Sequence, residues 1–273
     1  MTLRAVPLAE LHRRVRSADR GGAGELVEAL KRDRRLGARS LGQRLERRLD
    51  LERREAQRLA ALARFESKLR RSGLARVAGV DEVGVGPLAG PVVAAAVVLP
   101  EGLRLRGLDD SKKLSRAARE RLEGEIRAQA LGVGVGWATP DEIDRLRIYR
   151  AGLCAMQRAV RALPDAPDAL ALDARRIPGL ALPQYPIPGG DGKVAAIAAA
   201  SIVAKVFRDA WMRDLHHRWP EYGFSRHVGY ATEEHRRALA AAGPCPVHRR
   251  SFAPVREAKG AELRTEGPPF PTS

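Results

Sequence analysis

The chain has 273 residues, 44% of them hydrophobic, which is enough for one main domain with an additional segment. Its 49 Lys and Arg against 33 Asp and Glu give a formal net charge of +16, which favours a polyanionic partner over a merely solvated Arg-rich surface. Two widely spaced cysteines, a charged N-terminus and the lack of an apolar run of about 20 residues exclude a disulfide scaffold, a signal peptide and a membrane span, and predict a cytoplasmic protein.

Residues 1–72 predict a basic helical extension. Leucines between Leu26 and Leu51 recur at near-helical spacing among charges, and we expect a long helix from about Leu41 to Arg70. This segment holds 20 Lys and Arg against 10 Asp and Glu, so it carries most of the net charge. Two interpretations stay open: a module that contacts phosphates, or a solvated helical hairpin packed on the main domain.

From Val77 the pattern becomes rich in strands. Apolar, β-branched runs predict strands at 77–83, 92–99, 132–139, 169–173 and 184–187. Periodic runs predict helices at 115–130, 149–163, 193–219 and 232–242, with Ser115 and Thr232 as N-caps. This order predicts an α/β domain over residues 73–257, with a mixed sheet flanked by helices, and residues 258–273 are expected to be a disordered tail.

Four carboxylates stand out against apolar surroundings. Asp81 and Glu82 end the first expected strand, Asp173 ends another, and Asp191 precedes a helix of small residues. Singly, each is explained as a polar strand end or, for Asp191, as a helix N-cap. Acids from strand ends and from a helix start can also converge at one edge of a sheet. Such an oxygen-rich cluster suits Mg²⁺ or Mn²⁺, and paired divalent metals are a recurring solution for phosphodiester cleavage.

Several motifs in unbroken order resemble the ribonuclease HII family. They are VAGVDEVGVGPLAGPVVAAAV (77–97), DSKKLS (110–115), IPG (177–179), IAAASIVAKVFRD (197–209), YGF (222–224), HVGY (227–230) and HRRSF (248–252). The likeness covers about residues 75–255, and the helical leader is similar to extensions of some bacterial members. It implies an α/β ribonuclease H-like mixed sheet flanked by helices, with an N-terminal helical extension and a C-terminal helical region.

The resemblance also implies a function and a catalytic site. The activity would be that of an endoribonuclease that hydrolyses the RNA strand of RNA–DNA hybrids and cuts 5′ of ribonucleotides embedded in duplex DNA, with Mn²⁺ or Mg²⁺ as cofactor. Asp81, Glu82 and Asp173 would be the main metal ligands, and Asp191 would complete the catalytic site and position the attacking water. We expect a monomer that binds these duplexes and no membrane.

Substrate-binding residues follow from the same resemblance. The backbone of Gly84-Val85-Gly86 would contact the ribose 2′-hydroxyl, the group that distinguishes RNA from DNA. Tyr230 would pack on the deoxyribose beyond the ribonucleotide, and Ser111 and Lys112 would face the phosphate backbone. Two further residues, Lys205 and Arg208, are weaker candidates for phosphate contacts, with core or surface roles as the alternative.

Val85 departs from the family pattern, which has an arginine between the two glycines. Recognition by backbone groups survives this change, whereas the loss of an Arg–phosphate contact would cost about 1.5–3 kcal/mol. Two other functions therefore stay open: a duplex-binding paralogue with weakened catalysis, and a ribonuclease HIII-type enzyme. The latter usually carries an N-terminal domain with a sheet, whereas residues 1–72 are predicted to be helical.

Histidines and tryptophans in the second half of the chain have simpler explanations. His227, His235 and His248 match no familiar zinc spacing, so we assign them structural roles or peripheral phosphate contacts. Trp211 and Trp219 are expected to pack in the core rather than to stack on bases. No nucleophile motif surrounds Cys154 or Cys245, which excludes covalent catalysis by cysteine.

Overall fold

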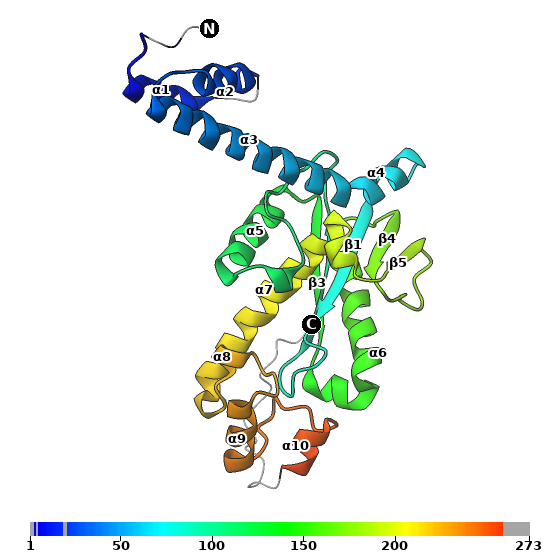
Figure 1. The fold of residues 1–273 in the computed structure, drawn as a ribbon. Helices are drawn as coiled ribbons and strands as arrows, with labels where there is room; N and C mark the ends of the chain where they lie inside the picture. The colour runs from blue at the N-terminus through cyan, green and yellow to red at the C-terminus, as the bar shows by residue number, and fades with distance from the viewer. Residues whose placement is uncertain (1–2, 4, 19–20, 259–273) are drawn as a thin grey trace. The chain divides into compact units, whose positions relative to one another are not determined.

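The computed structural model describes residues 3, 5–18 and 21–258 (Figure 1). The chain forms two compact units, Met1–Ala60 and Ala61–Ser273. Within the described ranges, no helix combines the length and the apolar character that a membrane crossing needs. Of the expected tail, residues 258–273, all but Ala258 lie outside the described residues.

The first unit is helical wherever the structure describes it. It consists of α1 (Leu8–Ser17), α2 (Ala23–Lys31) and most of α3 (Leu36–Leu62). Side chains from the three helices, among them Leu11, Leu30 and Leu45, form a buried apolar cluster. The leucine spacing in the sequence therefore marks the face of each helix that this cluster covers.

The predicted long helix differs in its boundaries, because it ends at Leu62 and a separate helix, α4 (Arg64–Arg71), follows a break at Ala63. This second helix belongs to the second unit. Glu66 on α4 is buried, and its Oε1 accepts a hydrogen bond from the Ala196 N–H at 2.8 Å. Burial raises the pKa of Glu66, because the charged form loses its hydration.

A five-stranded mixed sheet forms the second unit, with strand order β3-β2-β1-β4-β5. The strands are β1 (Val77–Val83), β2 (Val92–Val98), β3 (Gly132–Ala138), β4 (Ala169–Asp173) and β5 (Gln184–Ile187), each within one residue of its predicted bounds. The first three strands pair antiparallel, whereas β1, β4 and β5 run parallel. The expected α/β class with a mixed sheet is confirmed.

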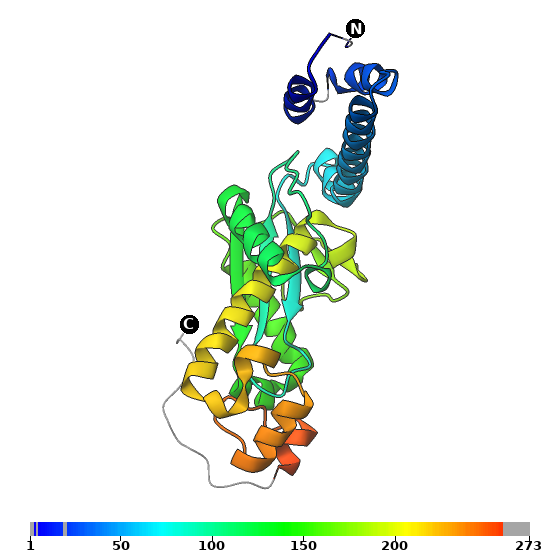
Figure 2. The ribbon, with the colours of Figure 1, turned by 60° about the vertical axis from the view of Figure 1, so that its left-hand side comes forward.

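Helices α6 (Pro140–Arg161) and α7 (Ala195–Arg218) cover opposite faces of this sheet (Figure 1, Figure 2). Alternation along β1 shows the two faces, because Val80 packs in the cluster that includes α6, while Val77 packs with side chains of α7. The predicted run of small residues lets α7 approach closely. A Cβ on Gly79 would overlap the backbone of Ala196, so only glycine fits there.

Two helix starts differ from the prediction. The helix expected at Tyr149 begins at Pro140, where Thr139 and Glu142 form a capping box, and a non-helical residue, Arg147 with φ 68°, interrupts it. That interruption breaks the apolar periodicity, which explains why the sequence pattern shows only the second part. The small-residue helix begins at Ala195 with Val194 as N-cap, so the alternative explanation of Asp191 as its N-cap does not hold. Ser115 and Thr232 are N-caps as predicted.

Short helices α8 (Phe224–His227), α9 (Glu233–Ala242) and α10 (Ala253–Glu257) form the predicted C-terminal helical region. This region hydrogen-bonds to the loop 84–91, which joins β1 to β2. Leu88 N–H donates to the Gly229 carbonyl and Gly90 N–H to the Val247 carbonyl, both at 2.8 Å. Trp211 and Trp219 are buried as expected, in the apolar cluster that the C-terminal region shares with α7.

Candidate metal centre and nucleic-acid interface

The four predicted acids lie at one edge of the sheet. Asp81 and Glu82 are near the C-terminal end of β1, and Asp173 ends β4. Because the two strands are parallel and Val80 is opposite Leu172, they end side by side. Asp191 lies in the 3₁₀ turn η2 (Gly190–Gly192), shortly after β5, the neighbour of β4. The structure thus brings together acids that are far apart along the chain.

Asp81 is buried among like charges. Its Oδ1 accepts the Glu82 N–H at 2.8 Å, and Ser201 on α7 donates a second hydrogen bond to its carboxyl group. Burial raises the pKa of Asp81 well above its ordinary value, and the charges of Glu82 and Asp173 raise it further, against the hydrogen bond from Ser201. A neighbouring cation would oppose this shift, because it favours the ionised carboxylate.

The two carboxylate oxygens of Glu82 differ, because one forms an ion pair and the other has no hydrogen-bond partner among the described residues. Its Oε1 lies 3.1 Å from Arg175 Nη1, whereas its buried Oε2 has no hydrogen-bond partner in the described part of the chain. Burial raises the pKa of Glu82, the Arg175 guanidinium opposes this, and Asp173 adds to it. A buried carboxylate oxygen without a partner is costly, because it has lost its water and gained nothing in return.

Asp173 and Asp191 are connected through their own turn. Asp173 Oδ1 accepts the Gly190 N–H at 2.8 Å, which fixes η2 against the end of β4. Asp191 Oδ2 lies 3.4 Å from Lys112 Nζ. Burial raises the pKa of Asp191, with Asp110 and Asp173 adding to the shift and Lys112 opposing it.

These donors suit a hard divalent cation, although no three His, Cys, Asp or Glu side chains of the described residues already form a complete metal-binding group. All the candidate ligands are carboxylate oxygens, the donors that Mg²⁺ and Mn²⁺ prefer. Glu82 Oε2 is buried without a partner among the described residues, and the charge of Asp173 raises the pKa of both Asp81 and Glu82. A divalent cation would relieve both the repulsion and the missing contact.

The 3₁₀ turn η1 (Ser111–Lys113) carries two predicted substrate-binding residues, one exposed and one buried. Lys112 points outward, with 78% of its side chain exposed, beside Asp191. Ser111 is buried, and its Oγ lies 2.7 Å from Ser201 Oγ. Because Ser201 donates to Asp81, the Ser111 hydroxyl supports that carboxyl group indirectly, whereas the resemblance implied that Ser111 faces the phosphate backbone.

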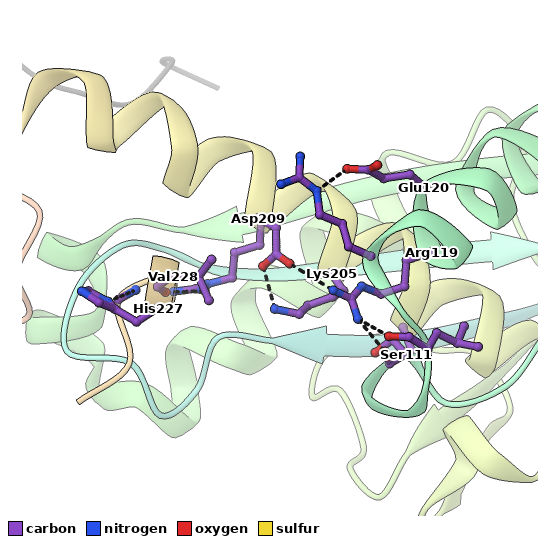
Figure 3. Close-up of polar contacts among 12 residues, drawn as sticks. Ser111, Arg119, Glu120, Lys205, Asp209, His227 and Val228 are labelled. Atoms are coloured by element: carbon purple, nitrogen blue, oxygen red, sulfur yellow. Dashed lines mark hydrogen bonds and ion pairs between the residues drawn. The ribbon is translucent and has the colours of Figure 1, made fainter. Parts of the chain in front are cut away.

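A network of charges holds η1 against α7 (Figure 3). Arg119 Nη1 donates to the carbonyls of Ser111 at 3.1 Å and Leu114 at 2.6 Å. The same guanidinium lies 3.8 Å from Asp209, which also accepts a hydrogen bond from Lys205 at 2.6 Å. The side chain of Lys205 therefore pairs with Asp209 inside this network, which favours its structural alternative over a phosphate contact.

The predicted ribose-binding segment lies beside the predicted tyrosine. A Cβ on Gly86 would be 3.9 Å from Tyr230 Cε1, so the two residues face each other. Tyr230 is 41% exposed, which leaves part of its ring open to a ligand. Val85 packs partly against the core cluster under the sheet, so its apolar side chain is turned to the protein.

Three arginines near these residues have roles that sequence analysis missed or left open. Arg175 pairs with Glu82 and stacks over the Tyr149 ring at 5.2 Å from its centroid. Arg208 and Arg249 are fully buried and donate only to backbone carbonyls. The position of Arg175, two residues after a predicted ligand, is the one signal in the sequence that could have identified it.

The three conspicuous histidines are buried together. The His227 ring stacks on the His235 ring with centroids 4.6 Å apart, and His235 Nε2 lies 3.0 Å from His248 Nε2. His235 Nδ1 lies 2.9 Å from the Tyr230 carbonyl, and Cys245 N–H donates to His248 Nδ1 at 3.1 Å. Every ring bonds to protein atoms, which confirms structural roles for them.

Comparison with known proteins agrees with the resemblance in the motifs. The family model for ribonuclease HII matches residues 78–255. The ribonuclease HII of Anaeromyxobacter sp. (strain Fw109-5) is 50% identical over 258 residues, 94% of this chain and 82% of the relative. That of Myxococcus xanthus (strain DK1622) is 51% identical over 245 residues, 89% of this chain and 83% of the relative.

Solved structures share the fold of the second unit. The ribonuclease H2 of Pyrococcus horikoshii OT3 superposes with a TM-score of 0.59 at 28% identity, covering 67% of this chain and 96% of that one. The ribonuclease HII of Archaeoglobus fulgidus, solved in a complex with PCNA, gives a TM-score of 0.52 at 30% identity, covering 60% of this chain and 86% of that one.

Proposed function

The chain belongs to the ribonuclease HII family, and from this premise we propose that Asp81, Glu82, Asp173 and Asp191 form its catalytic site. The chain is an endoribonuclease that hydrolyses the RNA strand of RNA–DNA hybrids, and divalent-metal catalysis is general for the family. The alternative of a ribonuclease HIII-type enzyme is therefore set aside. A duplex-binding paralogue with weakened catalysis is disfavoured because all four acids are present.

One observation carries the assignment of the metal ligands. Asp81 is buried and Glu82 is largely buried beside Asp173 at adjacent strand ends, and Glu82 Oε2 has no hydrogen-bond partner among the described residues. Like charges kept this close destabilise the fold unless a cation joins them. Mn²⁺ or Mg²⁺, when bound, supplies charge stabilisation at the attacking and leaving oxygens of the phosphodiester and lowers the pKa of a bound water.

The chain's own residues orient the reaction around that site. Asp81 and Asp173 would hold the cations from two neighbouring strands, and Glu82 would join them through Oε2, while its Oε1 keeps the contact with Arg175. Asp191, fixed by the turn that Asp173 anchors, would orient the attacking water. Lys112 lies 3.4 Å from Asp191 and extends into solvent, where a substrate phosphate would meet it.

Cleavage 5′ of a ribonucleotide requires recognition of its 2′-hydroxyl. We assign this to the backbone of Gly84-Val85-Gly86, and we assign the deoxyribose beyond it to the Tyr230 ring, because Gly86 and Tyr230 face each other. Since the contact uses peptide groups, valine at position 85 preserves it. We propose RNA–DNA hybrids and duplex DNA with embedded ribonucleotides as the partners, and a monomeric, cytoplasmic enzyme.

Cleavage of a labelled DNA duplex that contains one ribonucleotide tests this function. With Mn²⁺ or Mg²⁺ we expect one cut, on the 5′ side of the ribonucleotide, and none in EDTA or in an all-DNA duplex. Binding of the ribonucleotide-containing duplex without cutting, with either cation, would contradict the proposal and favour the non-catalytic paralogue.

A further inference from the structure

Arg249 is fully buried and holds carbonyls at the start of the loop 84–91 and near its end. Its Nη2 donates to the Gly84 carbonyl at 2.6 Å, its Nη1 to the Val85 carbonyl at 3.0 Å and its Nε to the Gly90 carbonyl at 2.9 Å. Its backbone N–H donates to the Leu88 carbonyl at 2.8 Å. One residue near the C-terminal end of the described chain therefore fixes four carbonyls of this loop.

Arg208, on α7, holds the second half of the loop. It is fully buried, and it donates to the Pro91 carbonyl at 2.9 Å and the Ala89 carbonyl at 3.2 Å. A third hydrogen bond, 3.0 Å long, goes to the Val228 carbonyl, and Val228 precedes Gly229 and Tyr230 by one and two residues. Gly84 has φ 87°, and a Cβ on it would overlap Arg208 Nε, so the guanidinium requires glycine at the start of the segment.

Both guanidiniums lack an acidic partner. Neither takes part in an ion pair with a carboxylate among the described residues, although burying a charge without a counter-charge is costly. Burial lowers the pKa of Arg208 to about 10, and burial and then the charge of Arg208 lower that of Arg249. The six hydrogen bonds that these side chains donate to backbone carbonyls are what offsets this cost, which indicates that the charges serve the loop.

The direction of the carbonyls decides which groups the loop exposes. In a trans peptide the C=O and the following N–H point in opposite directions. Because the Gly84 and Val85 carbonyls point to Arg249, the N–H groups of Val85 and Gly86 point away from it. Neither N–H donates to another backbone group in the loops and turns that the structure describes, so both are available to an oxygen of a ligand.

We infer that Arg208 and Arg249 are positioning residues for ribonucleotide recognition, which act as a two-guanidinium clamp on the loop 84–91. The clamp turns the Val85 and Gly86 N–H groups toward the ribose and keeps Gly86 opposite Tyr230. This inference rests on the proposed function, because it explains how that segment selects a 2′-hydroxyl. It also explains why valine is acceptable at position 85, since the clamp binds the main chain and not that side chain.

Arg249→Lys and Arg208→Lys test the clamp, because lysine keeps the charge but cannot donate to carbonyls in several directions. The matched control is Arg250→Lys, the exposed neighbour of Arg249. For each protein, well below its Tm, we would measure kcat and KM on a duplex with one ribonucleotide and the inhibition constant of the same duplex without it. Hydrogen exchange of residues 84–90 reports the loop directly.

We expect both clamp variants to raise KM toward the inhibition constant of the all-DNA duplex, by roughly tenfold to a hundredfold, the range for losing a hydrogen bond from a charged group. We expect kcat to stay within a few-fold and loop amides to exchange faster, with no change in Arg250→Lys. Unchanged discrimination in both variants overturns the clamp, whatever happens to Tm.

Failure of the proposed function would look different. A wild-type chain that cuts no ribonucleotide-containing duplex removes the function, and the clamp is then judged by exchange alone. Faster exchange of residues 84–90 in Arg249→Lys supports the clamp in that case, and unchanged exchange overturns it.

Discussion

Two clusters of titratable side chains in the second unit contrast sharply. At the sheet edge, burial and like charges raise the pKa of Asp81, and Glu82 Oε2 is buried without a partner in the described chain. In the C-terminal region, the rings of His235 and His248 are just as buried, yet each of their nitrogens bonds to a protein atom. In the carboxylate cluster, no described residue satisfies Glu82 Oε2. In the histidine cluster, every ring nitrogen of His235 and His248 has a partner in the protein.

Hydrogen-bond donors determine the protonation of the second cluster. Cys245 N–H donates to His248 Nδ1, so that ring carries its proton on Nε2 and donates it to His235 Nε2. His235 in turn carries its proton on Nδ1 and donates to the Tyr230 carbonyl. His227 accepts from Gly229 N–H in the same way. The three imidazoles are therefore neutral. A fully hydrogen-bonded network of this kind holds the backbone in place. Carboxylates that are buried close together with raised pKa values indicate a catalytic or metal site instead.

The sharpest test of this contrast is Asp81→Asn. We expect a loss of activity on the order of a thousandfold or more, because a metal ligand is removed. We also expect the metal-free protein at pH 7 to gain free energy of unfolding, since no charge is then buried at this position and the repulsion with Glu82 and Asp173 disappears. Cleavage rates and urea denaturation measure the two effects.

Asp165→Asn is the matched control, because Asp165 is an exposed acid that pairs with Arg76 at 2.9 Å. It should change neither activity nor stability by much, as is typical of surface ion pairs. A metal-free Asp81→Asn protein that is clearly less stable than the wild type would show that the carboxylates at the sheet edge do not destabilise the metal-free fold. The contrast with the imidazoles would then be wrong.

The imidazole cluster predicts acid sensitivity. The pKa of His235 is lowered to about 4 and that of His248 to about 3, chiefly by burial, so both stay neutral in the fold while the unfolded chain takes up protons below its ordinary pKa. The stability that the two neutral rings contribute is therefore full above the histidine pKa of the unfolded chain, and it decreases as the pH drops through that pKa. Between pH 7 and pH 5 we expect a loss of roughly 2 kcal/mol for each of the two rings.

Urea denaturation at both pH values gives this slope. His235→Gln should lower stability at pH 7 but flatten the slope, whereas His217→Gln, in an exposed position, should leave it unchanged. The charge of His227 lowers the pKa of both rings further, and Cys245, whose Sγ lies 3.1 Å from His248 Nδ1, does not reverse the sign, because burial is the largest cause of both shifts. A stability that is flat from pH 7 to pH 5 would show that the rings are not held neutral.

Divalent cations should stabilise the first cluster and leave the second unaffected. At a Mn²⁺ concentration of a hundred times the dissociation constant, we expect about 2.7 kcal/mol of added stability from mass action. The same addition should have little effect on Asp81→Asn and a full effect on His235→Gln. Tm measured with and without Mn²⁺ decides this, and equal stabilisation of Asp81→Asn would place the cation elsewhere.

Much of the sheet edge was predictable from sequence. Asp81, Glu82 and Asp173 end apolar runs whose strand character is visible in their residue types, and parallel strand ends converge. The clamp was not predictable, because Arg208 and Arg249 look like any surface arginine until the loop they hold is placed in three dimensions. The start of α6 was missed for a related reason, since the break at Arg147 interrupts the helical period. Local sequence patterns thus predicted most helices and strands, whereas the position of the loop 84–91 depends on hydrogen bonds between residues far apart along the chain.

The distinction between partnered and unpartnered charges also applies to the first unit. Three exposed arginines of α3, Arg44, Arg47 and Arg54, form no ion pair among the described residues, and their spacing places them on one side of the helix. Other exposed arginines there are paired, such as Arg13 with Glu10 and Arg32 with Glu28. Arginines without an acidic partner can neutralise phosphates and release counterions from a duplex without breaking an ion pair in the protein.

Replacing Arg44, Arg47 and Arg54 by glutamine should therefore weaken binding of a ribonucleotide-containing duplex and flatten its salt dependence by up to about 0.9 for each phosphate that is no longer neutralised. The control replaces three arginines that have acidic partners, Arg13, Arg32 and Arg53, and so removes the same total charge. Binding isotherms at several salt concentrations give both slopes. If the slope flattens equally in the two triple variants, total charge alone attracts the duplex; if it flattens in neither, the charges of this unit are only solvated surface.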